Sequence, residues 1–514
     1  MTGPRRVAVV GAGPRALWAT ECLADAGADV AVTVLDPRTA GAGAAYDPAQ
    51  PPYLRLNVTS SIVGSGLGRL DDWRRARGET GPLDPFPPRA LVGEFWAESW
   101  AAVARRLELR HREATVSGLR RVDDRWCVLS RSDNAGADAH ADADGAPADR
   151  AGAHRDEDHP GERYDHVLLA AGHEDTWPGA WARRRPDAVS VFPVAGLTPE
   201  RVPAGARVAI RGAALTCIDA VLALTEGRGG RFGPAGYAAS GTEPALRPFS
   251  RHGRFMEPKP APDGPLAALD LTGPRDAGRA AIAASPGSVA CVAEAVRTTA
   301  LAYLRVAGGK QAGVGARARD AGVDAVLAGT DGGDPLDDLR HSLGVVEGAE
   351  RPHAAWAVGQ AFRDLYPAIV ASLSFERCPA ADWSDFARLA RTLERVAFGP
   401  PPVNAAKLLA LGDAGVIAPP TRAEPDADAR IDAVLPPPGV VPVSLVAGLV
   451  AAGVGALAPA RRGLRVHPDA SVPGAPGLAA VGRVTEDVVI GNDTLSRTLH
   501  DVVPRWAQKV SSHA

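Results

Sequence analysis

The stretch 7–16 near the N-terminus constrains the fold of this chain more than any other part of the sequence. Its letters, VAVVGAGPRA, indicate a buried β-strand that runs directly into a glycine turn and then a helix. Glycines allow the tight turn and the close approach of a diphosphate, and a helix N-terminus attracts the anion. The predicted cofactor-binding residues of this turn are Gly11, Gly13, Pro14, Arg15 and Ala16.

A second strand is predicted over residues 30–35, and it ends in Asp36. A carboxylate at this point of a βαβ unit accepts hydrogen bonds from the ribose hydroxyls of an adenosine. The first predicted ligand is therefore FAD or NAD rather than NADP. The alternative is an ordinary βαβ unit without a ligand.

A second strand, turn and helix is predicted over 207–219. Gly212 and Thr216 are its predicted cofactor-binding residues, but Ala214 replaces the second glycine, and its methyl group should weaken the binding of a pyrophosphate. Arg251 and Arg254 follow the next predicted strand. Guanidinium groups there can pair with a 2′-phosphate, which favours NADPH over NADH. Alternatively, both arginines are solvated or pair with acidic side chains.

Composition limits the remaining function classes. A length of 514 residues predicts two to three domains, and a net charge of −3 argues against nucleic acid or an anionic membrane as the main partner. The five cysteines include no C-x-x-C pair, so neither a metal site nor a redox dithiol is predicted. The first strand starts near residue 5, which leaves no room for a signal peptide and predicts a cytoplasmic protein. The uncharged stretch 440–459 is interrupted by Pro and Gly, and is predicted to be a buried helix of small residues rather than a membrane span.

The middle of the chain shows fewer chemical signals. A helix is predicted from about 86 to 107, strands over 109–116 and 126–130, and a solvated loop over 131–160. The strand 164–169 leads to Gly172 and His173, where small residues would let the backbone pass a bound FAD. Residues 255–400 are helical in pattern and are expected to form an insert that covers the active site.

The C-terminal segment 476–483 is similar to the last strand of FAD domains, and Gly482 would let the backbone approach the cofactor. An Asp usually follows that glycine to bind the ribityl chain; here Arg483 stands there, so Glu486 or Asp487 is expected to replace it. A helix is predicted to begin at 491–494, capped by Asn492 or Asp493. The predicted cofactor-binding residues of this segment are Gly482, Asp487, Asn492, Asp493 and Thr494.

These patterns predict an α/β fold with two dinucleotide-binding, Rossmann-like domains, of which the first is discontinuous, and a largely helical insert. The expected boundaries are 1–175 for the first part of the FAD-binding domain, 176–400 for the NAD(P)H-binding domain with the insert, and 401–514 for the return to the FAD-binding domain. In such a protein the stretch 54–61 passes the flavin ring. Asn57 or a nearby hydroxyl such as that of Ser60 would then hydrogen-bond flavin N5 or a peroxide, although a simple turn explains these residues equally well.

The same stretches resemble actinobacterial FAD/NAD(P)-binding proteins related to the class B flavin monooxygenases and the amine N-hydroxylases. The matching pieces include 11–14, 54–57, 170–173, 212–219 and the run GNDTLSR at 491–497. The resemblance implies that NADPH reduces FAD, that oxygen adds at flavin C4a, and that the hydroperoxide transfers one oxygen to an amine. It implies a small amine or amino acid, with aspartate as one candidate, in natural-product biosynthesis. Arg55, Arg89 and Arg497 are the candidate substrate-binding residues.

Two other functions stay open at this point. The chain could be an NAD(P)H-dependent flavin oxidoreductase that passes electrons to a partner or small acceptor, since Ala214 is compatible with a weak nicotinamide site. It could also be a non-catalytic scaffold that binds FAD. The expected partners are a small substrate and O₂, without nucleic acid or membrane, and a homo-oligomer is left open.

Overall fold

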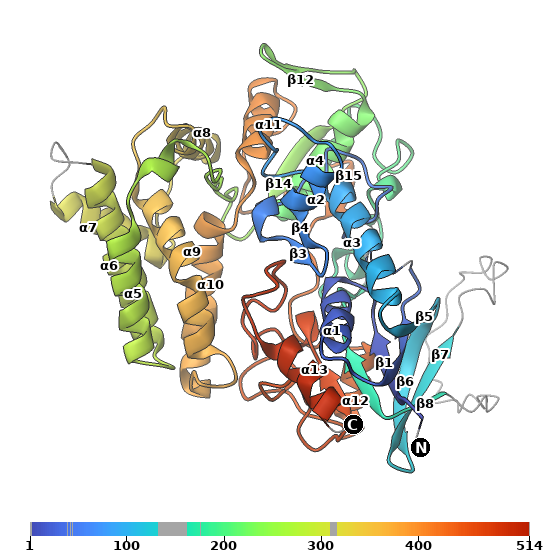
Figure 1. The fold of residues 1–514 in the computed structure, drawn as a ribbon. Coiled ribbons are helices and arrows are strands. Elements are labelled where there is room, and N and C mark those ends of the chain that lie inside the picture. The colour runs from blue at the N-terminus through green and yellow to red at the C-terminus, as the bar shows by residue number, and fades with distance from the viewer. Residues whose placement is uncertain are drawn as a thin grey trace.

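The computed structural model describes residues 3–38, 40–41, 43, 45–131, 162–174, 176–308 and 316–512. Two parallel β-sheets and a lobe of helices make up this part of the chain (Figure 1). The predicted α/β class, with two Rossmann-like sheets and a helical insert, is confirmed. The predicted loop over 131–160 lies, from residue 132 onward, outside the described residues.

The first sheet has five parallel strands in the order β16-β9-β1-β2-β5. They are β1 (Arg5–Val10), β2 (Val30–Leu35), β5 (Glu108–Arg112), β9 (His166–Leu169) and β16 (Leu478–Ala480). The helices packed here are α1 (Pro14–Asp25), α3 (Arg89–Ala104) and α13 (Val502–Ser512). Because helices cover the faces of a parallel sheet, its central strand β1 is apolar and buried from Val7 to Val10, whereas the edge strand β5 is polar.

A three-stranded antiparallel sheet lies beside the first sheet, formed by β6 (Thr115–Val122), β7 (Arg125–Arg131) and β8 (Glu162–Tyr164). The prediction of one strand over 109–116 is therefore wrong. The stretch forms two separate strands, because β5 pairs with β2 in the parallel sheet and β6 pairs with β7 in the antiparallel sheet. The smaller elements of this part are β3 (Gly64–Ser65), β4 (Gly68–Arg69), α2 (Leu70–Ala76) and α12 (Leu445–Ala451).

The second sheet has four parallel strands in the order β10-β15-β11-β14. They are β10 (Ala188–Ser190), β11 (Arg207–Arg211), β14 (Ala245–Phe249) and β15 (Ala429–Asp432). The elements around them include α4 (Leu215–Leu224), α11 (Pro402–Asp413) and the hairpin of β12 (Arg231–Gly233) and β13 (Gly236–Ala238). Because β15 pairs with β10 and β11, the second sheet extends beyond the expected boundary at residue 400, and the chain re-enters the first sheet only at β16.

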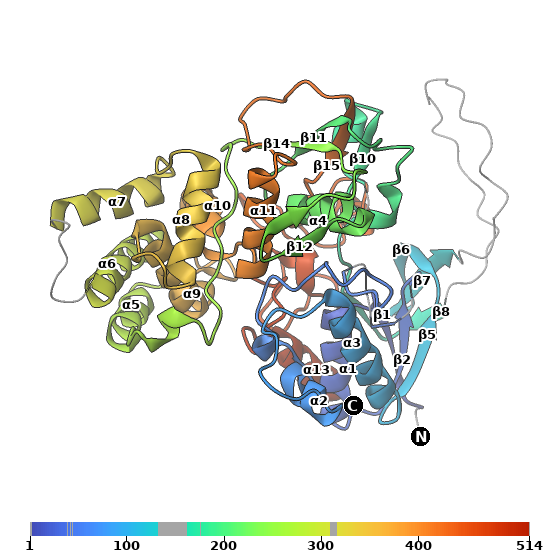
Figure 2. The ribbon, with the colours of Figure 1, turned by 90° about the horizontal axis from the view of Figure 1, so that it is seen from above.

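The helical insert forms a separate lobe beside the two sheets in both ribbon views (Figures 1 and 2). Its helices are α5 (Thr272–Ala284), α6 (Val289–Gly308), α7 (Ala316–Ala328), α8 (Pro335–Val346), α9 (Ala354–Leu373) and α10 (Ala380–Ala397). The lobe has its own apolar core, centred on α6, α9 and α10, whereas Leu339 and Leu343 of α8 pack into the core of the second sheet. The helical pattern predicted over 255–400 is confirmed by these helices.

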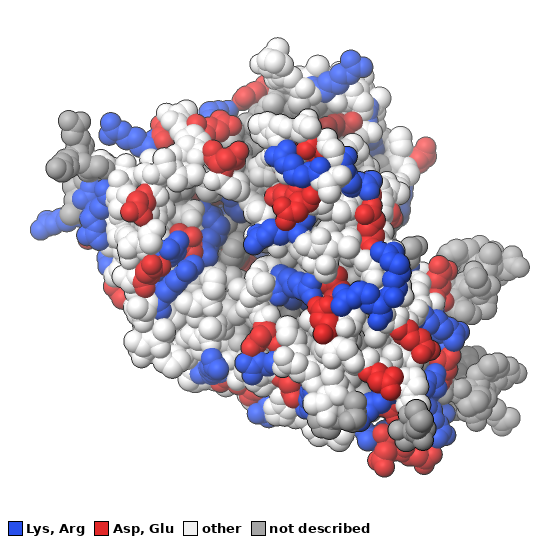
Figure 3. All heavy atoms as spheres, in the orientation of Figure 1, with Lys and Arg blue, Asp and Glu red and all other residues white. Residues whose placement is uncertain are grey.

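The C-terminal helix differs from its prediction. Residues 491–500 form turns, and α13 begins at Val502, so no helix N-terminus lies at Asn492 or Asp493. The apolar spacing of Leu495 and Leu499 continues that of α13, and the predicted helix therefore began too early in the sequence. None of the helices in the described ranges has the length and apolar character needed to cross a bilayer, and the uncharged stretch 440–459 holds only the short α12. Acidic and basic side chains are interspersed on the face drawn in Figure 3.

Candidate functional site

The first glycine turn has the predicted construction. Gly11 has φ +103°, its N–H donates to Leu35 O at 2.8 Å, and a Cβ there would lie 2.5 Å from Ala170 O. Only glycine fits such a position, because a side chain would be strained and would collide with backbone. Gly13 precedes α1, and a Cβ on Gly13 or on Gly172 would meet no protein atom within 4 Å. The approach to the N-terminus of α1 is therefore open to a ligand.

Asp36 lies directly beside this turn. Its Oδ2 accepts from Ala12 N at 2.9 Å and its Oδ1 from Arg38 N at 2.8 Å. An ionised carboxylate has about four acceptor sites, so these two bonds leave room for ribose hydroxyls. The structure thus brings together the turn and the acid that the sequence predicted to act together.

The second glycine turn repeats the first. Gly212 has φ +107°, its N–H donates to Phe249 O at 2.8 Å, and a Cβ there would lie 3.1 Å from Ala433 O. Ala214 precedes α4 as Gly13 precedes α1, and it is exposed. Its methyl group therefore occupies the place that the first turn leaves open. Thr216 lies in the first turn of α4.

The two turns differ in the residue that follows the second strand of each unit. Ser250 follows β14 where Asp36 follows β2, and the exposed Arg251 comes next, without an ion pair to any of the residues that the structure describes. A segment that ends at Thr421 runs parallel to β14, so Arg422 leaves the sheet at the same edge. Burial lowers the pKa of His252. The positive charges of Arg251, Arg395, Arg422 and Arg254 lower it further. The sequence did not indicate Arg422, because its pairing with β14 is a tertiary contact.

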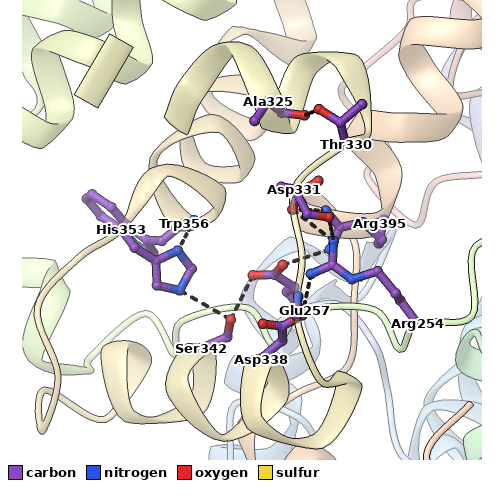
Figure 4. A network of polar contacts seen from close by, with 11 residues as sticks. Arg254, Glu257, Ala325, Thr330, Asp331, Asp338, Ser342, His353, Trp356 and Arg395 are labelled. Atoms are coloured by element: carbon purple, nitrogen blue, oxygen red, sulfur yellow. Dashed lines mark hydrogen bonds and ion pairs between the residues drawn. The ribbon is translucent and has the colours of Figure 1, made fainter. Parts of the chain in front are cut away.

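Arg254, the second predicted 2′-phosphate ligand, is held elsewhere. Its guanidinium forms ion pairs with Asp331 at 3.0 Å and with Asp338 at 2.8 Å, inside a polar network of the insert (Figure 4). Arg395 joins the network through Asp331 at 2.5 Å and Glu257 at 2.7 Å. The alternative interpretation, in which the arginine pairs with acids, is correct for Arg254.

The three candidate substrate-binding arginines also have carboxylate partners. The structure brings two of them together, because Arg89 Nε donates to Arg55 O at 3.0 Å. Arg55 pairs with Asp84. Arg497 pairs with the buried Glu21 at 2.7 Å. Arg89 binds Asp219 through two bonds of 2.9 and 3.0 Å and so connects α3 of the first domain to α4 of the second. Their partners are distant in sequence, so the sequence alone could not show that these charges are already paired.

The return segment 482–494 meets the first glycine turn. Gly482 has φ +78°, and a Cβ there would lie 3.5 Å from Arg15 Cγ. Arg15 Nη2 donates to Thr494 O at 2.9 Å. Burial lowers the pKa of Arg15 to about 10, and the carboxylates of Asp493 and Glu486 oppose that shift. Arg15 therefore lies at the junction of the turn and the return segment.

Glu486, rather than Asp487, presents its carboxyl group inside this junction. Asp487 accepts from Arg462 N at 3.3 Å, and its carboxylate lies 3.7 Å from Arg462 Nε; its role as a cofactor ligand stays a prediction. Glu486 Oε1 accepts from Gly491 N at 2.8 Å, whereas its buried Oε2 has no hydrogen-bond partner within the described part of the chain. Burial and Asp493 raise the pKa of Glu486 well above its ordinary value. Such an unpaired buried oxygen is the kind of group that a ligand hydroxyl satisfies.

The other predicted residues of this region have mixed roles. Asn492 is buried, its amide donates to Thr485 Oγ1 at 2.5 Å, and its role in cofactor binding stays a prediction. The Oδ2 atom of Asp493 lies 3.9 Å from Nη1 of Arg483. Burial and Arg483 lower the pKa of His173 to about 4, which places the predicted crossing point beside the return segment.

The segment that contains Asn57 and Ser60 lies nearby. Ser60 is buried, its N–H donates to Pro85 O at 2.8 Å, and Val63 forms a β-bridge with Ser496 of the C-terminal segment. The catalytic role of Asn57 and Ser60 stays a prediction. A cavity of about 690 Å³ opens between α1, the end of α9 and residues 492–505, and Arg15 and Trp18 line it.

The insert faces the return segment with Tyr366 of α9 and Glu394 of α10. A Cβ on Gly491 would lie 2.8 Å from the Tyr366 hydroxyl. Glu394 is exposed on α10, and partial desolvation and the Asp493 carboxylate raise its pKa to about 7. Neither residue carries a signal in the sequence beyond the expectation that the insert covers the site.

Comparisons with known proteins agree with this construction. Residues 8–145 match the family described as FAD-NAD(P)-binding. None of the curated proteins matches the chain. An ornithine N-hydroxylase of Kutzneria sp. 744, solved with FAD, NADP⁺ and L-ornithine, is 11% identical, with 99% of each chain covered and a TM-score of 0.50. A flavin monooxygenase mutant of Stenotrophomonas maltophilia is 15% identical over 100% of this chain and 98% of its own, with a TM-score of 0.42.

The described residues contain no group of three or more His, Cys, Asp or Glu that could hold a metal ion, and none of the five cysteines, all of them described, forms a disulfide. The matched range covers β1, α1, β2 and the first glycine turn, which are the elements that would receive a dinucleotide. The first domain thus matches the FAD-NAD(P)-binding family over residues 8–145, and the chain has a fold similar to that of the Kutzneria N-hydroxylase.

Proposed function

We propose that this chain is an FAD-dependent, NADPH-using monooxygenase that N-oxygenates a small amine or amino acid. The observation that carries the proposal is the pair of glycine turns, built alike but followed by opposite charges. Asp36 stands beside the first turn, and Arg251 and Arg422 stand at the edge beside the second. A carboxylate suits the free ribose hydroxyls of FAD, and guanidinium groups suit the 2′-phosphate of NADPH.

The residues of the first domain fit FAD at several points. The open space beside Gly13 and the N-terminus of α1 would receive the pyrophosphate, and Asp36 would bind the ribose. The unpaired Oε2 of Glu486, close to Gly482, would accept a hydrogen bond from the ribityl chain. Glu486 thus takes the role that an Asp after the last glycine has in related domains.

Bound FAD supplies the redox chemistry, which transfers two electrons from NADPH to O₂. The balanced reaction is amine + O₂ + NADPH + H⁺ → N-hydroxyamine + H₂O + NADP⁺. An amine reacts only when neutral, so an ammonium substrate must first lose a proton. Glu394 is suited to accept it, because a base works best when its pKa lies near the working pH, and partial desolvation and Asp493 raise the pKa of Glu394 to about 7.

The same observations limit the choice of substrate. Aspartate would need cationic groups for two carboxylates, and Arg55, Arg89 and Arg497 are all paired with acids of the protein. The proposed substrates are therefore small amines and amino acids as a class, with aspartate as one member to be tested. The resemblance to the N-hydroxylases favours a reaction in natural-product biosynthesis.

The test is a screen of amines and amino acids with the FAD-loaded protein, NADPH and ¹⁸O₂. We expect one substrate to gain a single ¹⁸O atom, with NADPH consumed in equal amount. Glu394→Gln should retain reduction of the flavin by NADPH but lose most of the oxygenation. Exposed Glu98, which binds Arg77 and Trp73, provides the matched control Glu98→Gln.

Three outcomes separate the alternatives. Reduction of the flavin by NADPH with all electrons recovered as H₂O₂ or in an added acceptor, and no oxygenated amine, would support the oxidoreductase. Bound FAD that NADPH does not bleach would support the scaffold. Equal oxygenation by wild type and Glu394→Gln would refute the role of Glu394 while leaving the monooxygenase in place.

A further inference from the structure

We propose that the helical insert holds a second small-molecule site, which binds a free amino acid with an apolar side chain. Arg363 would bind the carboxylate of this ligand, and Asp364 would bind its ammonium group. The site goes beyond the proposed function, because only the insert and the segment that leads into it line the pocket, and neither glycine turn contributes. The amino acid would be bound there without being oxidised.

The site is a pocket of about 330 Å³. Small-molecule sites usually measure about 300–1,000 Å³, so the pocket suits a ligand at the small end of that range. The loop 260–269 and the start of α5 form one part of its lining. Helix α9 forms the other part, through Trp356, Gln360, Arg363 and Asp364.

Hydrogen bonds place the two charged groups of α9 at opposite ends of one amide. Arg363 Nη2 donates to Gln360 Oε1 at 2.7 Å, and Gln360 Nε2 donates to Asp364 Oδ2 at 3.1 Å. A guanidinium only donates and a carboxylate only accepts, so the orientation of this amide is fixed. The amide offers an acceptor to the cation and a donor to the anion. A zwitterionic amino acid has the same pattern of acceptor and donor, with full charges.

Each charged group has only neutral hydrogen-bond partners in the protein. The second partner of Arg363 is Ala397 O at 2.8 Å, and the second partner of the Asp364 carboxylate is the Tyr303 hydroxyl at 2.7 Å. Burial lowers the pKa of Arg363 to about 10, and the charge of Asp364 opposes that shift. A guanidinium has five donors and a carboxylate about four acceptor sites, so both groups keep capacity for a ligand. Bonds between charged groups are stronger than those to neutral groups, which favours an oppositely charged ligand atom at each.

A third polar group of the pocket wall lacks a partner. Trp356 is 5% exposed, and its Nε1 donates to none of the residues that the structure describes. A buried donor without an acceptor is costly, and an oxygen atom of a ligand can supply the missing bond. The first turn of α9 is held in place, because Trp356 N donates to His353 Nδ1 at 3.4 Å and His353 Nε2 lies 3.2 Å from Ser342 Oγ of α8 (Figure 4).

Most of the remaining lining is apolar. Arg275 of α5 is the exception, and its guanidinium is already paired with Asp276 at 3.0 Å. A hydrocarbon side chain gains free energy by leaving water for such a surface, so L-leucine is the probe that matches both the charges and the apolar lining. The apolar lining residues are Pro260, Ala261, Pro262, Leu266, Ala267, Leu269 and Leu271.

The experiment is calorimetry of the purified full-length protein with three ligands. They are L-leucine, isocaproate, which lacks the amino group, and isopentylamine, which lacks the carboxylate. We expect L-leucine to bind about tenfold or more tightly than either analogue, because each analogue loses one charge-assisted interaction. Equal binding of L-leucine and either analogue would overturn the recognition of a zwitterion. An absence of L-leucine binding would overturn the site.

Two variants separate the two ends of the ligand. Asp364→Asn should weaken L-leucine binding about tenfold or more without weakening isocaproate, because the amide keeps the size of the carboxylate and loses its charge. Arg363→Gln should weaken both L-leucine and isocaproate and leave isopentylamine unchanged. The matched control is Asp385→Asn, at an exposed acid of α10 that pairs with Arg388. Equal losses of L-leucine and isocaproate in Asp364→Asn would refute the role of Asp364.

A further measurement needs no variant and so does not depend on its folding. Saturating L-leucine should slow hydrogen exchange in peptides that cover 260–272 and 354–364, and should leave those of α11 unchanged. Protection confined to other parts of the chain would contradict the site. L-Aspartate is the comparison ligand, and tighter binding of L-aspartate than of L-leucine would overturn the apolar preference. None of these readouts uses NADPH or oxygen, so they stay separate from a failure of the proposed monooxygenase.

Discussion

Replacing Arg89 with alanine should destabilise the protein by about 3–5 kcal/mol at neutral pH, which is typical when one partner of a buried ion pair is removed. Arg89 and Asp219 share two hydrogen bonds of 2.9 and 3.0 Å, and their side chains are only 12% and 6% exposed. The pair connects the two sheet domains through α3 and α4. The variant leaves the Asp219 carboxylate buried without its partner, and this accounts for most of the predicted cost.

The loss of stability in Arg89→Ala should depend on pH. Burial raises the pKa of Asp219, and Arg89 opposes that shift. Without Arg89 the folded-state pKa rises further above the unfolded value of about 3.9. An acid whose folded pKa is raised loses stability as the pH rises from the unfolded value through the folded value. Arg89→Ala should therefore be less destabilised at pH 5 than at pH 8.

The assay is urea unfolding of the FAD-loaded protein, followed by tryptophan fluorescence, at both pH values. The control is Arg388→Ala, which removes an exposed pair with Asp385 and should change the free energy of unfolding by less than about 1 kcal/mol. The double variant Arg89→Met/Asp219→Leu should recover most of the lost stability, because apolar groups of similar volume replace a buried pair at little cost. A loss below about 1 kcal/mol in Arg89→Ala, or a loss that does not depend on pH, would refute the reasoning.

Three further predictions concern the site. Asp36→Asn should weaken FAD binding about 10- to 100-fold, the value of one or two charge-assisted hydrogen bonds, as measured by titrating the apoprotein with FAD; an unchanged Kd would remove Asp36 from the ribose site. Arg251→Ala and Arg422→Ala should each raise the KM for NADPH about tenfold and leave that for NADH within about twofold; equal losses for both would argue against a 2′-phosphate contact. Wild-type kcat/KM for the amine should fall as the pH drops below about 7, because Glu394 must be ionised to accept a proton, and Glu394→Gln should lose that limb of the pH profile; a limb that persists in the variant would assign it to another group.

The sequence was sufficient for the local units of the fold. The strands β1 and β2 are recognisable without an alternation of polar and apolar residues, because each is a short apolar run. The first run ends in Gly11, which a tight turn requires for steric reasons. The second ends in Asp36, which a ribose site requires for electrostatic reasons. Gly212 has the same backbone conformation as Gly11. The sequence indicated this, because a predicted strand precedes each glycine and a predicted helix follows it. These signals are local, because each depends on residues within one strand, turn and helix.

The charged residues show where local information ends. Nothing near Arg89 in the sequence reveals Asp219, and nothing near Arg254 reveals Asp331 and Asp338, so each arginine looked free to bind a ligand. The extra strand β15 has only four residues and carries no pattern of its own, so the expected boundary fell too early. Whether a charge is free depends on which distant segment lies beside it.

The sequence by itself thus determined the two nucleotide-binding turns, the order of domain and insert, and the choice of an acid for the first turn. Only the tertiary structure decided which polar groups meet or stay unpaired: Arg422 joins Arg251 at one sheet edge, Glu486 keeps an unpaired oxygen, and Asp493 of the return segment raises the pKa of Glu394 in the insert. The physical reason is that steric and periodic constraints act between neighbours in the chain, whereas burial and charge pairing act between neighbours in space.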